Sequence, residues 1–258
     1  MDDDQKPQVI SRAAALLRAV AACAPEGGTT TGLARTAELP RPTAHRLLVA
    51  LAEQGLVDRD HRTGRWSLGP ELYLLGSLAA HKYDITHHAV PVLRELARET
   101  GESAFLSARR GDETVCIASE EGSFPLRSHV LHIGIRFPLG VASAGLAILA
   151  HLPRRELEKY LARTDLPARW GESHGTGPLS SRLAEVRANG YATNPGLIIE
   201  GSWGMAAAVF DHRDEPAWAI SVTGVETRFS TERRGELGPK LVIAAHTLSR
   251  SLQRITGG

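Results

Sequence analysis

The chain is poor in the patterns that mark several whole classes of protein. Only two of its 258 residues are cysteines, Cys23 and Cys116, so a disulfide scaffold is excluded and reduced thiols are expected. No segment reaches the run of about eighteen apolar residues that a membrane span needs, and the first residues lack the order of a secretory signal. The net charge is only +1. We therefore expect a cytoplasmic protein.

Patterns that carry catalysis, metal binding or nucleotide binding are also missing. There is no phosphate-binding loop and no dinucleotide fingerprint. The histidine pairs His87–His88 and His129–His132 lack the i, i+4 helical spacing of zinc hydrolases, and scattered surface histidines are the better interpretation. Cys116 lies in an alternating run without the glycine-rich elbow of a nucleophile. We expect no catalytic residues, no metal site and no cofactor.

Residues 29–69 predict two short helices followed by a strand–turn–strand hairpin. Apolar residues keep a helical period from Thr31, a candidate N-cap, to Ala37. Leu39 precedes Pro40, which pushes it out of the helical region and ends the first helix. A second helix begins directly afterwards. This order is typical of a winged helix-turn-helix, which places its second helix in the major groove of DNA.

The second helix has one apolar face and one polar face. Pro42 suits its first turn, and Gly55 is a candidate left-handed cap at its end. The buried stripe follows the spacing i, i+3, i+4, i+7 and consists of Ala44, Leu47, Leu48 and Leu51. The opposite face carries donors and cations that can read bases or hold phosphate: Arg41, Thr43, His45 and Arg46. The alternative is an ordinary solvated face.

The hairpin predicts a basic wing. Two short alternating segments flank the sequence HRTG, in which Gly64 supplies a positive φ. The tip has side chains suited to phosphate or minor-groove contact: Arg59, His61, Arg62 and Arg65. Residues 9–69 contain eight Arg against five Asp or Glu, whereas acidic and basic residues balance over 70–258. The basic excess therefore lies on the part predicted to bind DNA.

The segment LARTAELPRPTAHRLLVALAEQGLVDRD…TGRWSLGPELYLLG resembles the N-terminal domain of the IclR family of bacterial transcriptional regulators. Later blocks resemble the family in the same order: VPVLRELARETGESAFLSARRGDETVCIAS, GIRFPLGVASAGLAILAHLP, LAEVRANGYATN, AAAVFDHRDEPAWAISVTG and RFSTERRGELGPKLVIAAHTLSRSL. The resemblance covers nearly the whole chain from Val9. It implies a linker helix after the winged helix, and then a ligand-sensing domain with a GAF-like fold.

The expected organisation is a mobile tail at 1–8, a winged helix-turn-helix at 9–69, a linker helix at 70–83 and an effector-binding and oligomerisation domain at 84–258. The linker, PELYLLGSLAAH, is more apolar than a spacer requires, so we expect a homodimer or a dimer of dimers. Strand-like and helix-like runs alternate beyond it without a repeat. This pattern predicts an α+β domain, an antiparallel sheet flanked by helices.

The resemblance also implies where an effector binds. The family's pocket lies between the start of the small-residue helix, the loop after a Gly-Tyr pair and the last hairpin. Ser221 and Thr223 are two apart on a strand, so both hydroxyls face one side and can hold a carboxylate or carbonyl. The alternative is two solvent-facing strand positions. The full set of equivalents is Ser143, Ala144, Asn194, Gly204, Ser221 and Thr223.

Two positions depart from the family pattern. The family commonly has an acidic residue where Asn194 stands, and often a cysteine where Gly204 stands. The neighbouring loop is unusually apolar and supplies candidates for a pocket wall: Leu197, Ile198, Ile199 and Trp203, with Phe124 or Trp218. These features favour an aromatic acid or its amide over an acid of two or three carbons. Core packing is the alternative account of the same residues.

Three functions fit these observations. The first is a transcriptional regulator that binds a near-palindromic double-stranded operator and responds to a small-molecule effector. The second is a DNA-binding regulator whose sensor domain serves only for assembly, which the departures at Asn194 and Gly204 support. The third is a small-molecule enzyme with an incidental winged helix, which the missing catalytic motifs disfavour. The sequence favours the first.

Overall fold

The computed structural model describes residues 8–80 and 85–256, and within these ranges no helix is long and apolar enough to cross a membrane. The chain divides into two compact units, residues 1–83 and 84–258. Nearly all of the expected tail and the end of the expected linker lie outside the described residues. Each unit has its own hydrophobic core and is described separately.

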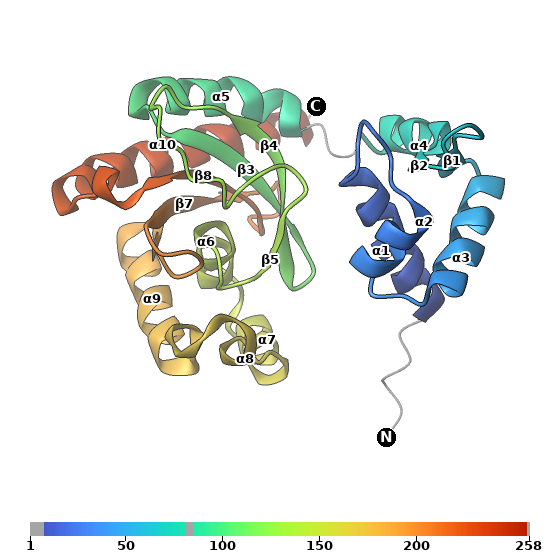
Figure 1. The fold of residues 1–258 in the computed structure, drawn as a ribbon. Coiled ribbons are helices and arrows are strands. Elements are labelled where there is room, and N and C mark those ends of the chain that lie inside the picture. Colours follow the sequence, from blue (N-terminus) through green and yellow to red (C-terminus); the bar gives the residue numbers. More distant parts are fainter. Residues whose placement is uncertain (1–7, 81–84, 257–258) are drawn as a thin grey trace. The chain divides into compact units, whose positions relative to one another are not determined.

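The first unit is the predicted winged helix-turn-helix with a further helix after it (Figure 1). Its core is centred on Leu16, Leu48 and Trp66, which are at most 1% exposed. The antiparallel hairpin forms the wing. The elements are α1 (Gln8–Ala21), α2 (Thr30–Thr36), α3 (Arg41–Glu53), β1 (Val57–Arg59), β2 (Trp66–Leu68) and α4 (Pro70–Ala80).

The caps and turns of this unit agree with those predicted from the sequence, with one correction. Thr29, not Thr31, is the N-cap of α2, because its extended backbone lets its Oγ1 accept from the Gly32 N–H at 3.2 Å. Thr31 lies inside the first helical turn, where its side chain cannot cap. Gly55 and Gly64 adopt the expected positive φ values, +67° and +69°. As predicted, Gly55 follows the end of α3 and Gly64 lies in the turn between β1 and β2, where a positive φ costs glycine little.

The second unit is built on a six-stranded antiparallel sheet with the order β5-β4-β3-β8-β7-β6. Two hairpins, β3–β4 and β7–β8, form its centre, and the short strands β5 and β6 form its edges. The strands are β3 (Ser103–Arg110), β4 (Glu113–Glu120), β5 (Arg136–Pro138), β6 (Ala192–Pro195), β7 (Ser202–Phe210) and β8 (Pro216–Val225).

Helices cover both faces of this sheet, which gives the α+β architecture expected from the sequence (Figure 1). One face packs against α5 (Ile85–Thr100) and α10 (Thr231–Thr256). The other packs against α6 (Ser143–Ala150), which is buried along its whole length, and α9 (Thr176–Asn189). Smaller elements complete the unit: α7 (Arg154–Arg163), α8 (Pro167–Trp170) and the 3₁₀ turns η2 (Glu172–His174) and η3 (Glu226–Arg228).

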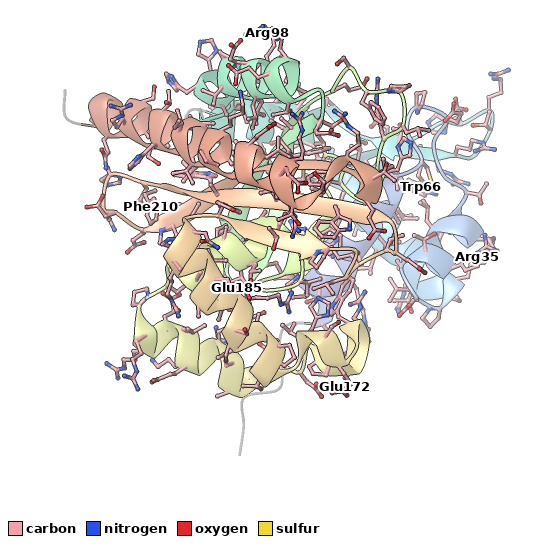
Figure 2. The ribbon with its side chains drawn as sticks, turned by 90° about the vertical axis from the view of Figure 1, so that its left-hand side faces the viewer. Arg35, Trp66, Arg98, Glu172, Glu185 and Phe210 are labelled. Carbon is pink, nitrogen blue, oxygen red and sulfur yellow. The ribbon has the colours of Figure 1, made fainter. Side chains whose placement is uncertain are left out.

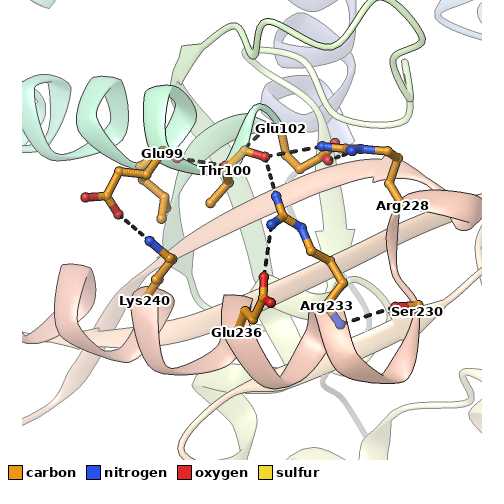
Figure 3. Close-up of polar contacts among 9 residues, drawn as sticks. Glu99, Thr100, Glu102, Arg228, Ser230, Arg233, Glu236 and Lys240 are labelled. Carbon is orange, nitrogen blue, oxygen red and sulfur yellow. Dashed lines mark hydrogen bonds and ion pairs between the residues drawn. The ribbon is translucent and has the colours of Figure 1, made fainter.

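A polar cluster joins the end of α5 to the start of α10 (Figure 3). The carboxylate of Glu102, 2% exposed, accepts from Arg228 Nε at 2.8 Å. The Thr100 carbonyl accepts from Arg233 Nη2 at 2.7 Å. Burial raises the pKa of Glu102 by more than the hydrogen bond from Arg228 lowers it. The cluster fixes the first turn of α10 against the end of α5.

Candidate functional sites

The outward face of α3 carries the side chains expected to contact DNA. Arg41, His45 and Arg46 are exposed, whereas Thr43 is half-buried. Leu47 belongs to the expected apolar stripe but is only half-buried, at the margin of the core. Arg41 Nε also donates to Thr31 Oγ1 of α2 at 3.2 Å. Cations and hydrogen-bonding groups thus line a helix face that the core leaves free.

Trp66 of β2 sets the geometry between this helix and the wing. Its indole is 1% exposed, and its Nε1 donates to Thr30 Oγ1 of α2 at 2.9 Å. The ring of His45 meets it edge-on with centroids 6.5 Å apart. The Arg59 guanidinium lies 5.4 Å from its ring centroid. One buried residue therefore holds α2, α3 and the wing together.

The wing presents Arg62 more freely than Arg65. Asp60 Oδ1 accepts from the backbone N–H groups of Arg62 at 2.8 Å and Thr63 at 2.7 Å, and these bonds hold the turn while the Arg62 side chain stays exposed. The same hydrogen bonds lower the pKa of the Asp60 carboxyl, and the bond from Thr63 has the largest effect. Arg65 Nη1 donates to the Gly27 carbonyl at 2.8 Å. Arg65 therefore also holds the base of the wing.

Arg12 of α1 borders the same surface, although the sequence pattern did not single it out. It lines a hollow of about 250 Å³ together with Val9, Thr43 and Arg46. Its guanidinium donates to Gln8 Oε1 at 2.9 Å, which leaves most of its donors free. The signal that could have identified Arg12 is its position on the exposed face of α1. Arg12 is therefore a further candidate for a phosphate contact.

In the second unit, strand register places three of the implied effector residues in one row. Asn194 of β6 pairs with Gly204 of β7, which pairs with Thr223 of β8. A Cβ at position 204 would lie 3.1 Å from Ser143 Oγ and 3.6 Å from Thr223 Cγ2. Glycine therefore leaves open the space that a side chain would fill among these residues.

This row borders a small cavity. Its volume is about 20 Å³, room for about one water molecule. Ala144 and Ser221 do not border it, because Ala144 packs in the core and Ser221 lies deeper along β8. The cavity is therefore smaller than the sequence departure at Gly204 led us to expect. It is lined by Val130, Leu131, Ala142, Ser143, Asn194, Ile198, Ser202, Trp203, Gly204 and Thr223.

Ser221 and Thr223 are buried, which rules out the alternative of two solvent-facing positions. They are 0% and 6% exposed, and neither hydroxyl oxygen has a hydrogen-bond partner among the described residues. They lie on the same face of β8 as Ala219, which packs in the core under α6. Leaving a buried hydroxyl unpaired costs about 1–3 kcal/mol. This face therefore carries polar groups that the protein alone does not satisfy.

Asn194 holds the walls of the cavity. Its Nδ2 donates to the Val141 carbonyl at 2.7 Å, and its Oδ1 accepts from the Leu197 N–H at 3.0 Å. These bonds tie the loop after β6 to the segment before α6. A carboxylate at this position could not donate to Val141, so the amide suits this chain.

The expected aromatic wall is not assembled. The ring of Trp203 stacks on Phe229, with centroids 6.2 Å apart, and both pack in the core beneath α10. Trp218 belongs to the same core. Strand alternation sends these side chains to the face opposite Ser221 and Thr223. Trp203 still borders the cavity, as does Ile198.

The segment between β4 and β5 also borders the cavity, and no sequence motif indicated it. Val130 and Leu131 border the cavity, and Leu131 is 9% exposed. Ser128 Oγ shares a hydrogen bond of 2.5 Å with Ser202 Oγ of β7. These contacts hold the segment against the sheet. The segment therefore forms one wall of the cavity.

Neither unit shows a catalytic constellation in the part of the chain that the structure describes. Cys23 and Cys116 are free, and burial raises the pKa of the Cys116 thiol to about 12, so it is protonated at neutral pH. No group of three or more His, Cys, Asp or Glu side chains converges there as a metal site would require.

Comparison with known proteins places both units in one family. Residues 9–61 match the IclR helix-turn-helix domain, and residues 77–250 match the family model described as bacterial transcriptional regulator IclR C-terminal. The HTH-type transcriptional regulator KipR of Bacillus subtilis is 33% identical over 87% of this chain and 89% of its own length. The transcriptional repressor IclR of Escherichia coli is 31% identical over 83% of this chain and 79% of its own length.

Solved structures agree in fold. The Thermotoga maritima IclR has a TM-score of 0.72 at 26% identity, over 95% of this chain and 99% of its own. An IclR regulator from Alicyclobacillus acidocaldarius has a TM-score of 0.77 at 25% identity, over 94% of this chain and 98% of its own. The relatives are transcriptional regulators and not enzymes. The chain belongs to the IclR family of DNA-binding bacterial transcriptional regulators.

Proposed function

We propose that this regulator binds its operator through α3 and the wing, and that a small organic acid or its amide in the second unit changes the affinity for that operator. The observation that carries the ligand response is the pair of buried, unpartnered hydroxyls of Ser221 and Thr223. A ligand oxygen is the partner that such hydroxyls require.

Operator binding rests on Arg41, His45 and Arg46, with Thr43 beside them and Arg62 and Arg65 on the wing. The recognition helix can meet base edges while the wing and Arg12 contact phosphates. One copy carries a modest basic excess, about +3 over residues 9–69. Two copies binding together supply the rest of the affinity, and the expected operator is near-palindromic with half-sites about 34 Å apart.

The surface that joins two copies is α4, where four apolar side chains are exposed on one short helix: Tyr73 at 77%, Leu74 at 54%, Leu75 at 49% and Leu78 at 73%. An exposed apolar cluster of this kind is typical of an interface. The partner is a second copy of the chain, packed helix against helix. Leu75→Glu with Leu78→Glu should shift the protein to monomers in analytical ultracentrifugation and weaken operator binding. An unchanged dimer would remove α4 from the interface.

The ligand class follows from the groups around the cavity. Hydroxyls at Ser143 and Thr223 border the cavity, and Ser221 lies deeper on the same face of β8. With the backbone N–H groups at the start of α6, these hydroxyls can hold a carboxylate or carbonyl oxygen. Val130 and Ile198 offer apolar contact on the other side. Since the cavity measures about 20 Å³, binding requires the segment between β4 and β5 to move. A small acid needs the least movement.

Thermal shift tests this assignment. Acetate, glyoxylate, benzoate and 4-hydroxybenzoate, each with its amide where one exists, are screened against the wild type and a Ser221→Ala, Thr223→Val variant. A compound that raises the Tm of the wild type and not of the variant supports the site. A compound that stabilises both equally binds elsewhere.

The second candidate is a regulator whose second unit serves only for assembly. The observation in its favour is the small volume of the cavity, about 20 Å³. It predicts that no acid or amide shifts the Tm, while operator binding and dimer formation persist. Operator titrations with and without each compound separate the two, since a ligand-responsive regulator changes affinity by a coupling free energy of about 1–3 kcal/mol.

A further inference from the structure

A larger hollow lies at the free edge of the sheet, apart from the effector cavity. Its volume is about 240 Å³, and α9, β6 and the first turns of α10 border it. Figure 2 shows α9, marked by Glu185, on one side of the sheet and the long α10 on the other. Since β6 is the last strand of the sheet, its outer edge opens into this hollow.

A partly buried guanidinium from α9 borders the hollow. Arg182 Nη2 donates to the Ser173 carbonyl at 2.9 Å, but Nε and Nη1 are buried without an acceptor. Burial lowers the pKa of Arg182, and Glu185 offsets this only in part. The buried His174 lies close enough for the Arg182 charge to lower its pKa further. The protein therefore compensates the charge of Arg182 incompletely.

A second guanidinium faces the hollow from α10. Arg234 lies 4.9 Å from the ring centroid of Trp203, and its Nη2 donates to Thr231 Oγ1 at 2.9 Å. Stacking and a neutral acceptor thus hold it in a fixed position. Within the described ranges, neither Arg182 nor Arg234 forms a salt bridge with a carboxylate. Two cations from different helices therefore border one space without a direct counter-ion.

The remaining lining completes a site for a small anion. Thr193, Thr231 and Asn189 supply neutral hydrogen-bonding groups, and Leu146, Val186 and Tyr191 supply apolar surface. Glu185 is the single carboxylate in the lining. The hollow is smaller than the roughly 300–1,000 Å³ of sites for drug-sized ligands. Its occupant must therefore be small, carry negative charge and have a short carbon frame.

We propose that this hollow binds a small organic dianion, a dicarboxylate or a phosphate monoester, as a second ligand of the regulator. Paired guanidiniums recognise such groups through charge-assisted hydrogen bonds. Thr193 borders the hollow and Asn194 borders the effector cavity, so neighbouring side chains of one strand serve the two sites. The dianion is thereby placed to change the affinity for the effector.

Isothermal titration calorimetry of the full chain at constant ionic strength tests the proposal. The probes are succinate, glycerol 3-phosphate and inorganic phosphate, with uncharged succinamide as the matched control. Succinate or glycerol 3-phosphate should bind, and succinamide should not. The Arg182→Gln, Arg234→Gln variant should bind at least about tenfold more weakly. Arg155→Gln, which removes one charge from an exposed position on α7, should bind as the wild type does.

Two further variants keep the result decisive. Glu185→Gln removes the opposing carboxylate without removing a guanidinium, so it should bind the dianion a few times more tightly. Ser221→Ala with Thr223→Val alters the effector site alone and should leave dianion binding unchanged. Loss of binding in that variant but not in the arginine variant would assign the dianion to the effector cavity and overturn the proposal. So would binding of inorganic phosphate only, or of no anion.

Discussion

The two proposed sites of this regulator are built in opposite ways. On the DNA-binding unit the functional side chains, among them Arg46, are exposed and project from a helix whose other face is core. In the second unit Ser221 and Thr223 are buried and lack partners within the described structure. The first site depends on a rigid scaffold beneath free side chains. The second depends on buried polar groups whose partner we propose to be a ligand.

The largest expected effect concerns the scaffold of the first site. Trp66→Ala removes the residue that joins α2, α3 and the wing, and a buried Trp→Ala substitution costs about 3–5 kcal/mol. The transition of the first unit should move to lower temperature or vanish in calorimetry, while the second unit melts as in the wild type. Trp218→Ala, in the core beneath α5 and α10, should show the reverse. A single melting transition that shifts in both variants would contradict the claim that the two units have independent cores.

The free side chains of the first site should affect binding without affecting folding. Arg46→Ala should weaken operator binding by about 1–3 kcal/mol for each copy and reduce its salt dependence, with an unchanged Tm. Arg18→Ala removes an exposed arginine from α1 and serves as the control. Fluorescence anisotropy at several salt concentrations measures both. Equal effects of the two substitutions would mean that Arg46 contributes only general positive charge and that α3 does not recognise the operator specifically.

The buried hydroxyls of the second site should behave in the opposite manner. Ser221→Ala removes an unpaired buried hydroxyl, so without ligand it should raise the free energy of unfolding by about 1 kcal/mol, where most core truncations lower it. Urea denaturation checks the sign. Ala219→Gly, a truncation two positions away on the same strand face, should destabilise. A loss of stability in Ser221→Ala would mean that the hydroxyl is already satisfied.

Gly204→Ala sharpens the same contrast at the centre of the cavity. The added Cβ would lie 3.1 Å from Ser143 Oγ and fill the space bordered by Asn194 and Thr223. The ligand-induced rise in Tm should disappear while operator binding stays within about twofold of the wild type. Gly177→Ala, where an added Cβ meets no atom within 4 Å, controls for the change of residue type. A retained ligand response would place the effector elsewhere.

The smallest effect is a pH dependence at the polar cluster of Figure 3. Because burial raises the pKa of Glu102 above its ordinary value of 4.5, the folded state keeps the proton longer than the unfolded state. Its contribution to stability is therefore greatest below that value and falls as pH rises towards the raised pKa. Glu102→Gln should make the slope of Tm against pH less negative in this window. An unchanged slope would mean that Arg228 keeps the carboxylate charged.

The contrast between the sites also explains what the sequence could predict. The order of α2, α3 and the wing follows from a helical period and from Pro40, Gly55 and Gly64, which act locally. Exposure of Arg41 and Arg46 follows from the same period. The hairpins of the second unit follow from alternation, but β5 and β6 have three and four residues, too few for a pattern.

The cavity depends on long-range register, which sequence spacing does not contain. The row Asn194–Gly204–Thr223 forms across three strands, and a further wall of the cavity comes from the segment between β4 and β5. The expected aromatic wall was wrong for Trp218, which does not border the cavity, whereas Trp203 borders it although its ring packs against the core on the other face of the sheet. Of the six residues that the resemblance implied, the structure places Ser143, Asn194, Gly204 and Thr223 at the cavity.

The most direct test of the account is selection of the full chain against a random double-stranded DNA library, repeated with Arg46→Ala. We expect the wild type to enrich an inverted repeat with half-sites about one helical turn apart, and the variant to lose or relax the bases that the arginine contacts. Enrichment of no sequence, or of the same sequence with equal strength by both proteins, would contradict recognition through α3.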